Sequence, residues 1–241
     1  MLLSSVLLAG CSISDILPWG KKDNESEQKT PENSEENTGG NENLDELKNP
    51  FTLTINYSGS YLPSEWTDPG VVCDSTLLSS DTQNERLRNA TNAQVNNSNL
   101  LSELFFTKLN TAYGDGDSLV LQIGTGDPAK NKFNFGTFIW TSVKKIYRVD
   151  ISAQCYTKTL GSTDSSAHLQ IEAGKKGTDK NYDRPITSPV TFDMDLSVGQ
   201  DESLVYKAFS NTFPKGIDRF CLTSLGGRVF LKSISITWDL G

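Results

Sequence analysis

The chain has 241 residues, of which 36% are hydrophobic and 22% charged, and 30 acidic side chains outnumber 22 basic ones. This length is enough for one domain with a full hydrophobic core, but no segment offers the run of about 20 apolar residues that a membrane-spanning helix needs. A net charge of -8 excludes a nucleic-acid binder that relies on basic surface charge. A single histidine argues against histidine-based catalysis and histidine-rich metal sites.

The first eleven residues, MLLSSVLLAGC, are an apolar run that ends in LAGC at residues 8–11. The run is too short to span a bilayer, and small residues before a lone cysteine are typical of a processing site. It resembles the lipobox of bacterial lipoproteins, which implies cleavage after Gly10 and a lipid attached to Cys11. No basic residue precedes the run, so we expect the true start codon to lie upstream of Met1. The alternative is a buried N-terminal strand with an incidental cysteine.

Residues 12–50 are expected to form a disordered acidic linker. Its main part, residues 18–50, has four basic and nine acidic side chains and hardly any apolar ones. Such a segment buries too little surface to offset the entropy of ordering. Residues 51–241 hold the other 18 basic residues and 20 of the acidic ones, so the domain expected there is nearly neutral. Its charge therefore gives no indication of a charged partner.

From residue 51 onward, apolar and polar residues alternate in several segments, which is the pattern of half-buried β-strands. Each such segment presents its apolar side chains to one face of a sheet. The alternating apolar residues are Phe51, Leu53, Ile55 and Tyr57; Val149, Ile151, Ala153 and Cys155; Ala167, Leu169, Ile171 and Ala173; Val190, Phe192, Met194 and Leu196; and Ile234, Ile236 and Trp238.

Further apolar runs bring the number of expected strands to about nine, as in β-sandwiches and jelly rolls. These runs lie at residues 119–123, 133–140, 204–209 and 217–222. The pair Gly226–Gly227 is a two-residue hairpin signal between the last two strands, and residues 99–109 carry apolar side chains at helical spacing. The prediction is an all-β fold, an antiparallel jelly-roll-like β-sandwich over residues 51–241 with at most one or two short helices.

Four segments of this domain resemble a recurrent module of bacterial cell-surface proteins. They are SLVLQIGTG at 118–126, VKKIYRVDISAQCY at 143–156, SSAHLQIEA at 165–173 and SLGGRVFLKSISITW at 224–238. The resemblance implies a galactose-binding-like jelly roll of the kind that accompanies secreted nucleases, peptidases or adhesins. The family pattern carries no catalytic residue to transfer. Residues 58–117 lie outside the resemblance and are expected to hold an elaborated loop or a helical cap.

Three cysteines remain once Cys11 is assigned to a lipid: Cys73, Cys155 and Cys221. The chain has neither a CxxC motif nor a Cys/His spacing typical of zinc. Cys155 falls on the inward phase of its strand, so its simplest interpretation is a small buried hydrophobe. A disulfide between Cys155 and Cys221 on neighbouring strands is the alternative in an extracytoplasmic protein. The role of Cys73 stays open.

A candidate calcium loop contains Asp115 and Asp117, with Asp127 a little further along the chain. Carboxylates that alternate with glycines can converge on one Ca²⁺ ion through a flexible turn. The spacing of an EF-hand is absent, and an ordinary Asp/Gly turn before the strand at Leu119 explains the same residues. No other cofactor is expected.

Asp193 and Asp195 share one face of one predicted strand, as an acid and base pair of a glycoside hydrolase would require. Polar residues of an alternating strand point outward in any case, so a solvated surface is the competing interpretation. His168 also falls on an outward phase, and no Gly-x-Ser-x-Gly elbow supplies a nucleophile. We therefore expect a protein that is not an enzyme.

Aromatic residues in polar, loop-like segments are the candidate ligand-binding residues. They are Tyr61, Trp66, Tyr113 and Tyr182, with Arg184 close to Tyr182. Sugar rings stack their C–H faces on exposed aromatic rings, while Asn, Asp and Arg side chains bond the hydroxyl groups. The alternative is that these rings cap the open ends of the sandwich.

Together these patterns favour a lipid-anchored protein on the extracytoplasmic face of a bacterial membrane, attached through Cys11. Its folded part would be a non-catalytic β-sandwich that binds an extracellular ligand, with a glycan as the expected class and no nucleic acid as partner. The alternative is a structural or adhesive protein–protein module without a small-ligand site. An exposed apolar patch with no cleft would favour that module, and a hydrolase built on surface carboxylates is a third hypothesis.

Overall fold

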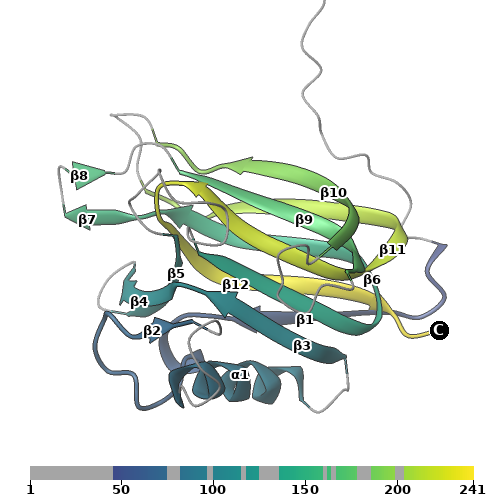
Figure 1. The fold of residues 1–241 in the computed structure, drawn as a ribbon, viewed down its shortest axis with the longest axis horizontal. Coiled ribbons are helices and arrows are strands. Elements are labelled where there is room, and N and C mark those ends of the chain that lie inside the picture. Colours follow the sequence, from purple (N-terminus) through teal and green to yellow (C-terminus); the bar gives the residue numbers. More distant parts are fainter. Residues whose placement is uncertain are drawn as a thin grey trace, which may run out of the picture. The chain divides into compact units, whose positions relative to one another are not determined.

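The computed structural model describes residues 46–74, 82–96, 100–114, 118–124, 136–159, 162–163, 167–177, 186–198 and 204–241. These residues belong to one structural unit, Thr38–Gly241, and most of them lie in antiparallel strands (Figure 1). The strands are β1 (Pro50–Asn56), β2 (Val72–Cys73), β3 (Leu101–Thr107), β4 (Leu109–Tyr113), β5 (Leu119–Ile123), β6 (Thr137–Cys155), β7 (Thr157–Thr159), β8 (Ser162–Thr163), β9 (His168–Lys176), β10 (Ile186–Asp195), β11 (Lys207–Gly226) and β12 (Val229–Asp239). The helix α1 covers Thr82–Val95, and a 3₁₀ turn covers Gly59–Tyr61.

Two long strands belong to both layers of a β-sandwich. β6 pairs with β3 over residues 137–142 and with β12 over residues 146–155, while β11 is its neighbour on the other side. The first layer therefore runs β1–β12–β6–β11, and the second runs β3–β6–β11–β9–β10. β5, β4 and β2 extend the first layer from the start of β12. The predicted antiparallel β-sandwich is confirmed.

The sequence analysis divides β6 and β11 into two strands each, and both divisions are wrong. In β11 the register with β6 is interrupted between Thr212 and Ile217, where Pro214 has no N–H to donate. The chain continues as a strand after this irregularity and passes into the second layer. A local break in alternation therefore marks a change of layer, not the end of a strand.

The main core lies between the layers, and a smaller apolar cluster lies on the opposite face of the second layer. Phe105, Ile139 and Cys221 of this cluster lie directly opposite one another on β3, β6 and β11. Residues 137–142 of β6 are consequently buried on both faces. This explains why the sequence there is a continuous apolar run instead of an alternating one.

The predicted helix over residues 99–109 is wrong, because this segment forms β3 and β4. Phe106 packs into the main core while Phe105 packs into the smaller cluster. Apolar residues that serve two opposite faces of a strand produce a spacing that resembles a helical one. Lys108, with φ of 47°, separates the two strands.

The domain's helix, α1, lies alongside β1, β2 and β3, on the side of the domain away from β10 (Figure 1). It confirms the helical cap expected within residues 58–117, although its sequence, TQNERLRNATNAQV, has few apolar residues. Leu87 and Val95 pack in the main core, and polar side chains attach the helix to the backbone of β1 and of the residue after β2. Asn84 bonds both the N–H and the C=O of Asp74, and Gln94 bonds both the N–H and the C=O of Asn56, at 2.7–2.8 Å.

Replacing Gln94 with leucine is expected to lower the free energy of unfolding by about 1–3 kcal/mol, because Asn56 would lose partners for its N–H and C=O. The volume of the side chain hardly changes, so the loss reports the hydrogen bonds. Urea denaturation of the full chain measures it. Asn92→Leu, at an exposed position of the same helix, is the control, and an equal loss in both variants would contradict this role of Gln94.

The turn at Gly226–Gly227 does not close a hairpin, which corrects the prediction. β11 and β12 lie on opposite sides of β6, so the turn carries the chain from the second layer to the first.

Cys155 and Cys221 pack in different apolar clusters, so the alternative of a disulfide between them is wrong. Cys155 lies in the main core, Cys221 lies in the smaller cluster, and no disulfide joins them.

The first and last strands of the domain are neighbours. β1 pairs with β12 along its whole length, and Pro50 lies opposite Asp239. The carboxylate of Asp239 accepts hydrogen bonds from the backbone N–H groups of Gly241 and Asn49. These bonds hold the pKa of Asp239 below its ordinary value.

Candidate functional site

Six residues that the sequence assigns to a site lie outside the described part of the chain. They are Cys11, Asp115, Asp117, Asp127, Tyr182 and Arg184. The lipid attachment, the calcium loop and part of the ligand-binding set therefore stay predictions. Within the ranges that the structure describes, no three Asp, Glu, His or Cys side chains come together as in a metal site.

Trp66 is buried, with 6% of its surface exposed, so the expectation of an exposed ring at this position is wrong. Its Nε1–H donates to Oε1 of Gln83 on α1 at 2.6 Å, and its ring packs in the main core. A large aromatic ring gains more by joining the core than by staying in a polar loop. Trp66 therefore attaches its loop to the helix and presents no face to a sugar.

Tyr61 and Tyr113 are the aromatic residues of the predicted set that are exposed in the described part of the chain, with 52% and 47% of their surfaces exposed. Tyr113 is the last residue of β4 and lies opposite Leu119 of β5. Because Trp66 is inside the core, the structure does not bring Trp66 and Tyr113 together on one surface. Ligand-binding roles for Tyr61 and Tyr113 stay predictions.

A row of side chains crosses the outer face of the first layer. Residues that lie directly opposite one another in antiparallel strands project from the same face. The register aligns Val72, Asn110, Gln122, Phe230 and Gln154 across β2, β4, β5, β12 and β6. Gln122, Gln154 and Phe230 of this outer row are buried. This outer face is therefore covered over part of its area.

A pocket of about 420 Å³ opens on this row, and we call it the Arg228 pocket. Asn110 and Gln122 of the row line it, together with Tyr156 and Arg228. The other lining residues are Pro69, Gly70, Val72, Thr111, Ala112 and Gly124. Residues from three strands and four connecting segments thus meet at one concave surface.

Arg228 and Tyr156 form a stacked pair in this pocket. The guanidinium carbon of Arg228 lies 4.6 Å from the centre of the Tyr156 ring, and the ring meets Phe230 edge-on at 5.1 Å. The backbone N–H of Tyr156 donates to the carbonyl of Arg228 at 2.9 Å. Stacking on an aromatic face orients a guanidinium while its N–H groups stay available around its edge.

The two carboxamides face each other across β4 and β5, since Asn110 lies opposite Gln122. Gln122 donates from Nε2 to the carbonyl of Gly124 at 3.3 Å, which fixes the orientation of its side chain. A carboxamide both donates and accepts hydrogen bonds. The pocket therefore combines flat stacking surface with donors and acceptors, which is what recognition of hydroxyl groups requires.

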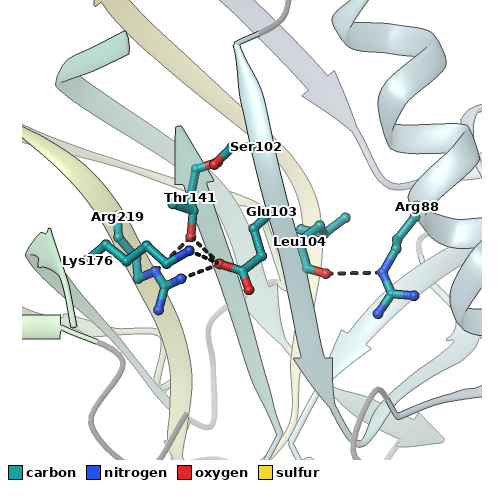
Figure 2. Close-up of polar contacts among 7 residues, drawn as sticks. All are labelled: Arg88, Ser102, Glu103, Leu104, Thr141, Lys176 and Arg219. Atoms are coloured by element: carbon teal, nitrogen blue, oxygen red, sulfur yellow. Dashed lines mark hydrogen bonds and ion pairs between the residues drawn. The ribbon is translucent and has the colours of Figure 1, made fainter. Parts of the chain in front are cut away.

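A second polar centre lies on the outer face of the second layer and surrounds Glu103 (Figure 2). The carboxylate of Glu103 contacts the guanidinium of Arg219, and Nζ of Lys176 lies 3.1 Å from it. Thr141 accepts from Nε of Arg219 at 2.7 Å and donates to Glu103 at 3.4 Å. Arg88 approaches the same strand from α1 and donates to the carbonyl of Leu104.

Only 1% of Arg219 is exposed. A buried guanidinium needs a charged partner and further hydrogen bonds, because its desolvation is costly. Glu103 and Thr141 supply both, and we therefore assign this centre to the stability of the second layer.

Asp193 and Asp195 lie on the exposed face of β10. Asp193 accepts a hydrogen bond from Gln170 at 2.7 Å, and Nδ1 of His168 lies 3.9 Å from Asp195. Hydrogen bonds from Ser197 hold the pKa of Asp195 below its ordinary value. A general acid needs the opposite shift, so these contacts favour the solvated-surface interpretation.

No protein-family model and no curated protein matches the chain. Similar solved structures include the K2 cleaved adhesin domain of Lys-gingipain, with 12% identity and a TM-score of 0.34 over 55% of this chain and 82% of that one. Apo BiXyn10A CBM1 has 12% identity and a TM-score of 0.28 over 49% of this chain and 72% of its own. TmCBM61 in complex with β-1,4-galactotriose has 9% identity and a TM-score of 0.24 over 58% and 88%. Similarity at this level carries no argument about the ligand of this chain.

Within the described ranges, no helix is long and apolar enough to cross a membrane.

Proposed function

We propose that the domain is a non-catalytic module that binds a glycan in the Arg228 pocket. The observation that carries the proposal is the convergence of Asn110, Gln122 and the stacked pair Arg228–Tyr156 on one concave surface. A volume of about 420 Å³ lies within the range of small-molecule sites and suits one or two sugar rings. A glycan is also the ligand class that the sequence predicts, but the sequence places it at loop aromatic residues and not at Arg228.

The lining residues have different roles in recognition of the glycan. The guanidinium of Arg228 donates to ring or hydroxyl oxygens, and the carboxamides of Asn110 and Gln122 donate to one hydroxyl and accept from the next. Tyr156 and Arg228 together supply the flat surface on which the C–H face of a sugar lies. The hydrogen bond from Gln122 to Gly124 holds the Gln122 carboxamide in place before the ligand arrives, which lowers the entropic cost of binding.

The test is a glycan-array screen of the full chain, followed by titration calorimetry of any glycan that binds. Arg228→Ala is expected to weaken binding by about tenfold or more, as loss of a charge-assisted hydrogen bond does. Arg148→Ala is the matched control, because Arg148 pairs with Asp150 and does not line the pocket. Binding that survives Arg228→Ala, or a folded chain that binds no glycan, would contradict the proposal.

An exposed apolar patch without a cleft would favour the alternative of a protein–protein module. The structure has pockets, and the most exposed valines, Val72, Val143, Val190 and Val205, lie on different segments. We retain lipid attachment at Cys11 and display on the extracytoplasmic face of a bacterial membrane as part of the proposal. They rest on the LAGC sequence and its polar linker.

A further inference from the structure

The sandwich core is open to solvent at the edge of the second layer. The register places Val190 of β10 opposite Ala173 of β9, and this row continues through Phe220 to Trp140 in the main core. Val190 therefore projects from the core-facing side of the sheet, yet 50% of its surface is exposed. A core-facing valine that is half exposed marks a place where one layer does not cover the other.

A pocket of about 660 Å³ occupies this opening, and we call it the edge pocket. Its walls are apolar: Phe192 and Phe213 meet edge-to-face at 6.1 Å, with Val190 and Ile217 beside them. Both walls are irregular strands. The register of β10 shifts between Thr187 and Val190, and that of β11 shifts between Thr212 and Ile217. These two irregularities keep the layers apart at this edge.

Two lysines, Lys175 and Lys215, lie at the rim of the edge pocket, and both are exposed. Two neighbouring lysines have ion-pair partners: Lys145 pairs with Asp218 at 2.5 Å, and Lys176 pairs with Glu103. Within the described ranges, no carboxylate forms an ion pair with Lys175 or Lys215. The rim is thus locally positive on a chain whose net charge is -8.

We propose that the edge pocket binds a small amphipathic carboxylate, such as a medium-chain fatty acid. The apolar part of the ligand would lie against Phe192 and Phe213 and cover the exposed side of Val190. Its carboxylate would face Lys175 and Lys215. Burial of apolar surface provides the affinity, and the two ammonium groups select an acid over a neutral or cationic amphiphile.

The first experiment compares decanoate with decanamide, each titrated into the full chain by calorimetry below its micelle concentration. Decanoate is expected to bind about tenfold more tightly than decanamide at low salt, the size of one or two exposed charge contacts. The difference should shrink at high ionic strength because exposed charges are screened. Equal affinities for the two ligands, or no binding of decanoate, would overturn the proposal.

Two variants separate the apolar part from the charged part. The double variant Lys175→Gln/Lys215→Gln should reduce decanoate binding to the decanamide level and leave decanamide binding unchanged. Val190→Asp should abolish binding of both ligands, and Val205→Asp, at an equally exposed valine outside the pocket, should change neither. Decanoate binding that survives Val190→Asp would place the ligand elsewhere and refute the proposal. This inference is independent of the Arg228 pocket, so Arg228→Ala should leave it intact.

Discussion

Glu103→Ala is expected to lower the free energy of unfolding by about 3–5 kcal/mol, because it leaves a buried cation without its carboxylate. Arg219 is 1% exposed and contacts Glu103 and Thr141. Once the carboxylate is gone, the guanidinium keeps its desolvation cost and still faces the ammonium group of Lys176. Urea denaturation at neutral pH measures the loss.

The matched control removes the exposed partner of the same carboxylate. Lys176 has 55% of its side chain exposed, so Lys176→Ala should cost no more than about 1 kcal/mol. Nearly equal effects of the two substitutions would show that Arg219 does not depend on Glu103. The double variant Glu103→Leu/Arg219→Met should recover much of the loss, since it removes both charges together.

Gly136→Ala is the other substitution with a large expected effect, about 3 kcal/mol. Gly136 has φ of 106°, and a Cβ atom there would lie 2.5 Å from the backbone nitrogen of Gly124. The backbone of Gly124, directly after β5, cannot move aside as a flexible side chain can. The cost therefore combines an unfavourable dihedral angle with a steric clash, and thermal or urea unfolding measures it.

Gly59→Ala separates these two contributions. Gly59 also has a positive φ, 56°, but a Cβ atom there would meet nothing within 4 Å. It should cost only about 1–2 kcal/mol, which is the price of the dihedral angle alone. If Gly136→Ala cost no more than Gly59→Ala, the close approach of Gly136 to Gly124 would not be rigid.

Alternation predicted the strands whose two faces differ in environment. β1, β9, β10 and β12 lie close to where period two places them. The pattern failed where both faces of a strand are buried, as at Phe105 and Phe106. Apolar spacing also did not predict α1, because Asn84 and Gln94 share its docked side with Leu87 and Val95. Those amides are recognisable only once their strand partners are known.

The candidate site was harder to predict than the fold. Loop composition identified exposed aromatics as candidates, but Trp66 has a partner on α1 and is buried. Tyr156 follows the last residue of β6, and Arg228 follows the turn before β12. An arginine after Gly-Gly and an aromatic residue at a strand end are weak signals on their own. Their meeting depends on the pairing of β6 with β12, which no local pattern encodes.

The pairing of β1 with β12 determines how the domain would carry a mechanical load. Pro50 and Asp239 are opposite one another, so the segment before β1 and the segment after β12 leave from the same end of this antiparallel pair. Tension between residues 46 and 241 would pull the two strands apart sideways and break their hydrogen bonds one after another, beginning beside Pro50. Sliding the strands lengthwise would instead strain many bonds at once. A force applied at residue 46 alone does not act across the β1–β12 pair. A force applied between residues 46 and 241 acts directly on this pair, whose hydrogen bonds then break one at a time.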